Sequence, residues 1–181
     1  RTRYEFGVKT SIAVTNARTA GGQFIVGMQA LPGNPYDGHT LSGQIEQVER
    51  LTGVAVERAY VDRGYKGHKH GGKARGYIAH TRGIASPTIK RELRRRNAIE
   101  PIIGHTKSDG LLERNHLAGA TGDAGEGQQC VGQAGIRCGA TQRSGGGAVA
   151  DFTHQLPAHA VNAQVDLRHF VVARATVRQF D

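Results

Sequence analysis

The stretch Val-Ala-Val-Glu-Arg-Ala-Tyr-Val-Asp-Arg-Gly-Tyr-Lys-Gly, residues 54–67, decides the fold class. Residues 54–61 are apolar and β-branched enough to predict a buried strand. The strand ends at Asp62, and the glycines that follow predict a loop. Asp62 is therefore expected at the carboxyl end of a strand.

Two more strands are predicted upstream. Apolar and polar residues alternate from Tyr4 to Val14, which is typical of a strand with one buried face, and the alternation returns from Phe24 to Met28. The polar residues 16–22 between them predict a turn. We therefore expect these two strands to be antiparallel neighbours.

The spacing of apolar residues from Leu41 to Leu51 predicts an amphipathic helix. Asp37 or Thr40 is available as its N-cap, and Gly53 stands where a left-handed residue ends a helix.

A second helix is predicted from Ser86 and Pro87, an N-cap and first-turn pair, through Leu93 toward Lys107. Pro101 predicts a kink, because a proline inside a helix costs about 3 kcal/mol.

The order strand, strand, helix, strand, helix predicts an α/β protein with a mixed sheet and flanking helices. It places Asp62 and Glu100 near one end of the sheet. Two carboxylates in such a position can share Mg²⁺ or Mn²⁺, the cations that suit hard oxygen ligands and that assist phosphoryl transfer.

Charge points to a polyanionic partner, with nucleic acid as the leading class. The 181 residues hold 24 Lys and Arg against 15 Asp and Glu, and residues 1–110 hold 18 of the basic and 9 of the acidic ones. Neither an apolar run long enough to cross a membrane nor a signal peptide is seen in the sequence, so we expect a bacterial cytoplasmic protein without a membrane partner.

The chain is expected to divide near residue 118. Residues 119–181 are rich in Gly, Ala and Gln and lack sustained periodicity, which predicts an irregular or disordered tail. Within this tail, residues 165–177 are compatible with one short strand or one short helix.

Three separated motifs carry a family resemblance: residues 31–41, residues 60–67 and residues 89–110. Together they resemble the DDE transposases of bacterial insertion sequences, of the insertion sequence 5 and insertion sequence 4 types. The signature of an Arg, three residues, a Glu, six residues and a Lys is matched by Arg96, Glu100 and Lys107. The Tyr expected three residues before that Arg is Leu93 here.

The resemblance implies a ribonuclease-H-like fold in which three acids bind two magnesium ions and cut and join DNA. It assigns Asp62 as the second catalytic and metal-binding acid and Glu100 as the third. The family carries its first Asp on a strand before the one at Tyr4. We therefore expect residues 1–118 to be a partial catalytic domain that lacks its first strand and is inactive alone, and the sequence after about Asp123 to be the product of a shifted reading frame.

DNA contacts are expected from basic residues around the two acids. The resemblance assigns Arg96 and Lys107 to the DNA near the cleavage site, and Tyr65 is equally suited to stacking on a displaced base or to the core. Transposon ends and target DNA are the implied partners, with a homo-oligomer when intact and a location at the nucleoid. The full set of expected DNA contacts is Arg63, Tyr65, Lys66, Lys90, Arg94, Arg96 and Lys107.

Two other functions are compatible with the sequence. One is a metal-dependent nuclease that works with Asp62, Glu100 and a single ion. The other is a non-catalytic basic nucleic-acid-binding module, in which Asp62 and Glu100 lie far apart.

Overall fold

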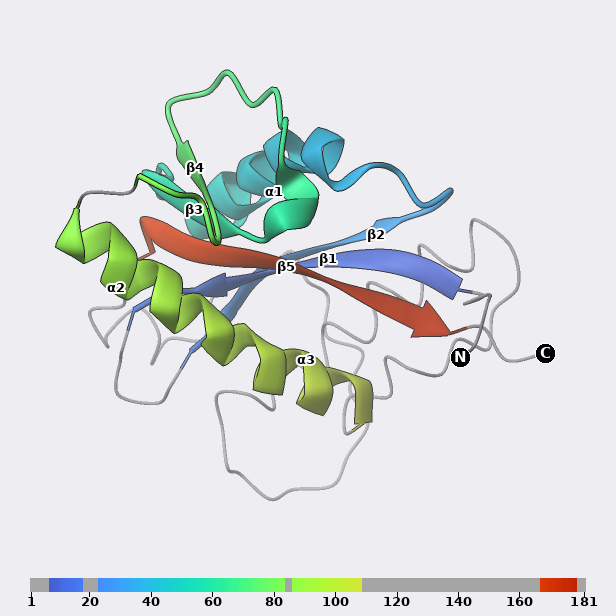
Figure 1. Ribbon diagram of the computed structural model, residues 1–181. Helices are drawn as coiled ribbons and strands as arrows, with labels where there is room; N and C mark the ends of the chain where they lie inside the picture. The colour runs from blue at the N-terminus through green and yellow to red at the C-terminus, as the bar shows by residue number, and fades with distance from the viewer. Residues whose placement is uncertain (1–6, 18–22, 84–85, 109–166, 179–181) are drawn as a thin grey trace.

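The structure is a computed structural model that describes residues 7–17, 23–83, 86–108 and 167–178. These residues form an α/β fold with helices on both faces of a five-stranded sheet (Figure 1). The strand order is β2-β1-β5-β3-β4, and the sheet contains both parallel and antiparallel pairs. The predicted α/β class with a mixed sheet is therefore confirmed.

The two predicted antiparallel strands are β1 (Gly7–Thr15) and β2 (Ile25–Leu31). They pair with Lys9 opposite Leu31, and the register shifts at a bulge near Val14. Alternate residues of β1 enter the two opposite cores of the protein, as the period-2 pattern predicts.

The centre of the sheet is β5 (His169–Arg178), which lies between β1 and β3. It runs antiparallel to β1 and parallel to β3 (Arg58–Val61), which in turn pairs in parallel with β4 (Arg75–Ile78). The irregular tail predicted over residues 119–181 is therefore corrected at residues 169–178, which form a strand. Of the short strand and the short helix considered for residues 165–177, the strand is present. The physical reason is the run Phe-Val-Val-Ala at 170–173, which is buried and suits a strand covered on both faces.

Helix α1 (Asp37–Thr52) begins one residue after its N-cap, Tyr36. The predicted N-caps, Asp37 and Thr40, are therefore wrong, because both residues already belong to the helix. Gly53 does end the helix in the left-handed conformation, with φ of 69°, and its N–H donates to the carbonyl of Glu49.

The second predicted helix consists of α2 (Pro87–Arg95), a 3₁₀ turn η2 (Arg96–Ala98) and α3 (Ile99–Ser108). Ser86 is its N-cap and Pro87 its first residue, as predicted. The irregularity predicted at Pro101 is a 3₁₀ turn, η2, which lies just before it. Pro101 is the third residue of α3, where a backbone N–H has no helical partner, so the irregular turn precedes the ring.

Each face of the sheet has its own core. Leu41, Ile45 and Val48 of α1 pack on one face, whereas Ile89, Ile99 and Ile103 of α2 and α3 pack on the other. Figure 1 shows α1 on one side of the sheet and α2 and α3 on the other. In the part of the chain that the structure describes, none of the helices has the length and apolar character needed to span a membrane.

Candidate functional site

Asp62 follows the last residue of β3, at the strand end where the sequence predicts it. It is the N-cap of the short 3₁₀ helix η1 (Arg63–Tyr65), and its Oδ1 accepts a hydrogen bond of 2.8 Å from the N–H of Gly64. One carboxylate oxygen of Asp62 is therefore held by the backbone, and the other is left to face α2 and η2.

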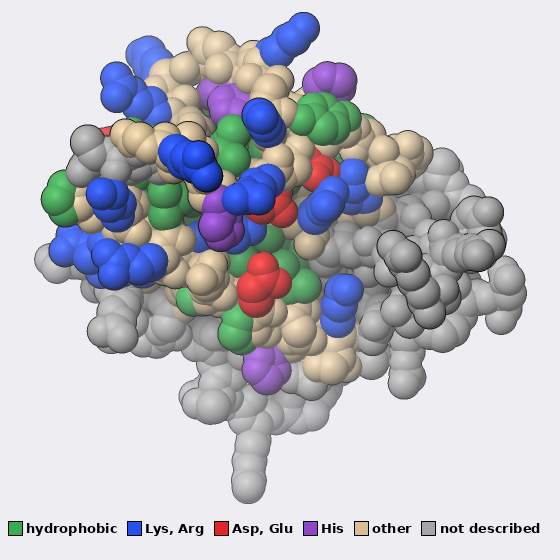
Figure 2. All heavy atoms as spheres, in the orientation of Figure 1, with side chains coloured by type: hydrophobic (Ala, Val, Ile, Leu, Met, Phe, Trp, Pro, Cys, Tyr) green, Lys and Arg blue, Asp and Glu red, His purple; other side chains and the backbone are tan. Residues whose placement is uncertain are grey.

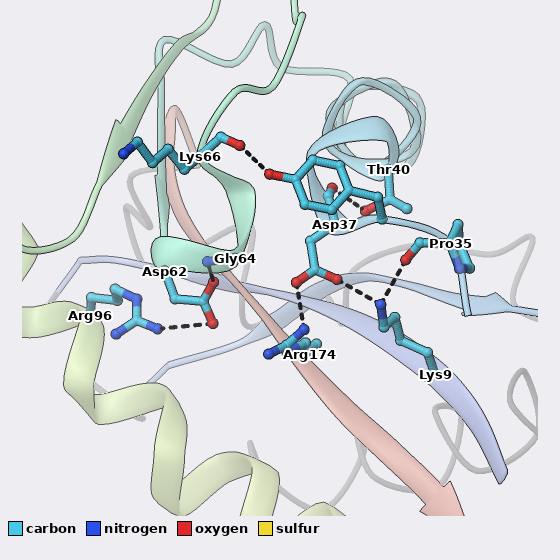
Figure 3. A network of polar contacts seen from close by, with 10 residues as sticks. Lys9, Pro35, Asp37, Thr40, Asp62, Gly64, Lys66, Arg96 and Arg174 are labelled. Carbon is cyan, nitrogen blue, oxygen red and sulfur yellow. Dashed lines mark hydrogen bonds and ion pairs between the residues drawn. The ribbon is translucent and has the colours of Figure 1, made fainter. Parts of the chain in front are cut away.

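Asp37, the first residue of α1, carries a second carboxylate at this place. Its side chain is only 3% exposed. Oδ1 accepts from Nζ of Lys9 at 2.8 Å, and Oδ2 accepts from the Arg174 guanidinium at 2.7 Å (Figure 3). The two cations come from the neighbouring strands β1 and β5, so Asp37 joins the first turn of α1 to the centre of the sheet.

Gly64 brings the two carboxylates together. A methyl group placed on Gly64 would overlap Oδ2 of Asp37 and would lie 3.0 Å from Oδ1 of Asp62. Since both oxygens lie within 3.0 Å of that one position, they are at most about 6 Å apart. Sequence reasoning treated Asp37 as a cap and missed this contact, because only the packing of α1 against η1 brings the two acids together.

Arg96 approaches Asp62 from the opposite side. Its side chain is 9% exposed, and Nη2 lies 3.8 Å from Oδ2 of Asp62 (Figure 3). Within the described residues its Nε is buried without a hydrogen-bond partner. The structure therefore brings together two residues that the sequence singled out, Asp62 and Arg96.

A buried cluster one helical turn earlier holds the helix against β3. Glu92 accepts hydrogen bonds from Arg58 Nη1 at 3.1 and 3.2 Å, and the hydroxyl of Tyr60 donates to the same carboxylate. The backbone carbonyl of Glu92 also accepts from Nδ2 of Asn16 at 3.1 Å. Burial and the hydrogen bond to Glu92 raise the pKa of Tyr60 well above its ordinary value.

Glu100 lies one turn beyond Arg96, in the first turn of α3, and its side chain is exposed. Lys107 is in the last turn of α3 and is partly buried. The cations paired with Asp37 and Asp62 are Lys9, Arg174 and Arg96, which come from β1, β5 and η2. The two acids named from the sequence are thus carried by different elements, with Asp62 in a network of ion pairs and Glu100 facing solvent.

The seven residues expected to contact DNA differ in their exposure, with Arg96 and Tyr65 buried and Lys107 partly buried. Four are exposed: Arg63 and Lys66 near η1, and Lys90 and Arg94 on α2. Figure 2 shows Lys and Arg side chains gathered on the upper left of the face drawn, with acidic side chains near its centre. Tyr65 is 1% exposed and belongs to the core. The stacking role of Tyr65 is therefore corrected, since a buried ring cannot meet a base.

The environment of Tyr65 links the core to the two acids. Burial raises the pKa of Tyr65, and the negative charges of Asp37 and Asp62 raise it further. The charges of the two acids therefore act on a tyrosine of the core.

In comparisons with protein-family models, with curated proteins and with solved structures, the chain matched none of them.

Proposed function

We propose that this chain is a DNA-binding domain of the DDE transposase type, which engages DNA beside Asp62 and does not cleave it in the arrangement described. The observation that carries the proposal is the position of Asp62 at the end of β3, faced by Arg96 from the helix that also bears Glu100. Transposon ends and target DNA are the partners that the family resemblance implies.

The arrangement of strands supports a ribonuclease-H-like fold within the α/β class. The antiparallel pair β1 and β2 lies at one side of the sheet, and the parallel pair β3 and β4 lies at the other. The helix α1 connects these two halves, and α2 and α3 cover the opposite face.

The exposed basic residues support binding to a phosphate backbone. Arg63 and Lys66 lie at the two ends of the short helix η1 that follows Asp62, and Lys90 and Arg94 lie on the helix that leads to Arg96. A protein that neutralises phosphates releases condensed counterions, so its affinity falls steeply with salt.

The Mg²⁺ or Mn²⁺ that the resemblance implies does not fit the side chains as they are arranged. Both oxygens of Asp37 accept from cationic side chains, and Asp62 faces Arg96. Over the described ranges, no group of three or more His, Cys, Asp or Glu side chains is placed to hold a metal ion. We therefore propose binding without strand cleavage.

Fluorescence anisotropy with a labelled duplex tests the binding, using the full chain at several salt concentrations between about 50 and 200 mM. The log–log slope against salt should be steep, and replacing both Arg63 and Lys66 by Gln should reduce its magnitude by about 2. Arg168→Gln is the matched control: Arg168 is exposed, and it pairs with Glu57 near the start of β3, at the end of that strand opposite Asp62. A flat salt response would contradict the proposal.

A nicking assay with Mg²⁺ separates this proposal from the single-ion nuclease. We expect no cleavage by the unchanged chain. Cleavage that is lost in Glu100→Ala would instead support a nuclease that uses Asp62 and Glu100.

A further inference from the structure

The carboxylate pair formed by Asp37 and Asp62 needs positive charge. Asp37 is 3% exposed, and burying a carboxylate is costly unless it is paired. A second carboxylate within about 6 Å increases the cost by like-charge repulsion. In a metalloenzyme a divalent cation can supply the missing charge between two such acids.

Here the chain supplies the charge itself. Lys9 and Arg174 each donate to a different oxygen of Asp37, and Arg96 lies beside Asp62. Three cationic side chains therefore surround two carboxylates. A further dication would meet a net positive environment rather than a negative one.

The two cations on Asp37 differ in how firmly they are held. Lys9 is 12% exposed and also donates to the carbonyl of Pro35 at 2.7 Å, so it is part of the packed structure. The side chain of Arg174 is 50% exposed. It covers Oδ2 of Asp37, which is the oxygen that approaches Gly64 and hence Asp62.

We propose that Arg174 is a built-in counter-ion that excludes divalent cations from the Asp37 and Asp62 pair, and that removing its charge creates a divalent-cation site there. The inference concerns the carboxylates and their neighbours alone, and it does not rest on the proposal that the chain binds DNA. Its experiment is therefore carried out without nucleic acid.

The test is titration of the full chain with Mn²⁺, with the free ion measured by electron paramagnetic resonance. The unchanged chain should show no saturable site below about 1 mM, the weak end of protein sites for hard cations. Arg174→Gln should bind one Mn²⁺ at least about tenfold more tightly, because a positive charge next to the ligand oxygen has been removed. Adding Asp37→Asn to Arg174→Gln should abolish that binding.

Arg168→Gln provides the control, since it removes the same charge six residues away, just before β5 begins. It should bind Mn²⁺ no better than the unchanged chain. Equal binding by the unchanged chain and Arg174→Gln would overturn the inference, as would a gained site that persists after Asp37→Asn.

Circular dichroism accompanies each titration. Arg174→Met, which keeps most of the aliphatic stem, is the second variant if Arg174→Gln does not fold. Loss of folding in both would also overturn the inference, because it would make Arg174 an indispensable part of the structure rather than a replaceable counter-ion.

Discussion

The hydroxyl of Tyr60 in β3 donates a hydrogen bond to the carboxylate of Glu92 in α2, and this contact sets the position of the helix along the strand. Two residues along a strand and four along a helix both advance about 6 Å. The next pair in the same direction is therefore Asp62 and Arg96, which lie 3.8 Å apart. The buried pair holds the helix in register, and the second pair forms at the site as a consequence.

Removal of the Glu92 carboxylate should be strongly destabilising. Glu92→Ala should lower the free energy of unfolding by about 3 kcal/mol or more, because it leaves Arg58 and Tyr60 without their shared acceptor. Tyr60→Phe should cost less, about 1 to 2 kcal/mol. Urea unfolding measures both. The exposed Glu46→Ala on α1 should stay within about 0.5 kcal/mol, and an equal loss at Glu46 and Glu92 would refute the role of the buried cluster.

Alkaline pH should weaken the fold through Tyr60 and Tyr65. Both pKa values are raised above the ordinary 10.0, so the folded state holds these protons more tightly than the unfolded chain. The stability that they contribute is fully present below pH 10 and is lost as the pH rises above 10. Urea unfolding across this range should show a shallower loss for Tyr60→Phe than for the unchanged chain. Parallel curves would show that Tyr60 titrates alike in both states.

Two glycine replacements should have opposite effects on stability. Gly64→Ala forces a methyl group against the carboxylates of Asp37 and Asp62 and should cost about 1 to 3 kcal/mol. Gly104→Ala meets open space inside α3 and should stabilise the protein by up to about 1 kcal/mol. Thermal unfolding compares them. A tolerated Gly64→Ala would mean that the two acids can move apart.

Substitutions at exposed and at buried residues of the expected DNA-contact set should have different effects, the first on DNA binding and the second on stability. Lys90→Gln and Arg94→Gln should each reduce the magnitude of the salt slope by about 1 and leave stability unchanged. Tyr65→Ala should instead lower the free energy of unfolding by about 3 kcal/mol or more, as for other buried aromatic residues. Anisotropy and urea unfolding on the same samples distinguish the two effects.

The sequence predicted those elements that are encoded by short stretches of neighbouring residues. The β1 and β2 pair, the Gly53 terminus of α1 and the position of Asp62 follow from alternation, capping and a strand end. The convergence of Asp37 on Asp62 could not be predicted, because it depends on how α1 packs against η1. Glu92 stands among basic residues in the sequence, and its partners Arg58 and Tyr60 lie 34 and 32 residues away. No local pattern therefore indicated its buried contacts. The place of β5 was missed because its apolar run follows a long segment without periodicity.

The central position of β5 also governs how this protein can fold during synthesis. Its residues 169–178 pair with residues 7–15 on one side and with residues 58–60 on the other. Among the described strands, β5 is the one that pairs with both halves of the sheet, and it follows the other four in the chain. Closure over such a sequence distance is slow, and the edges of β1 and β3 stay open until it occurs. A chain stalled before residue 169 would present both edges to chaperones or to other nascent copies.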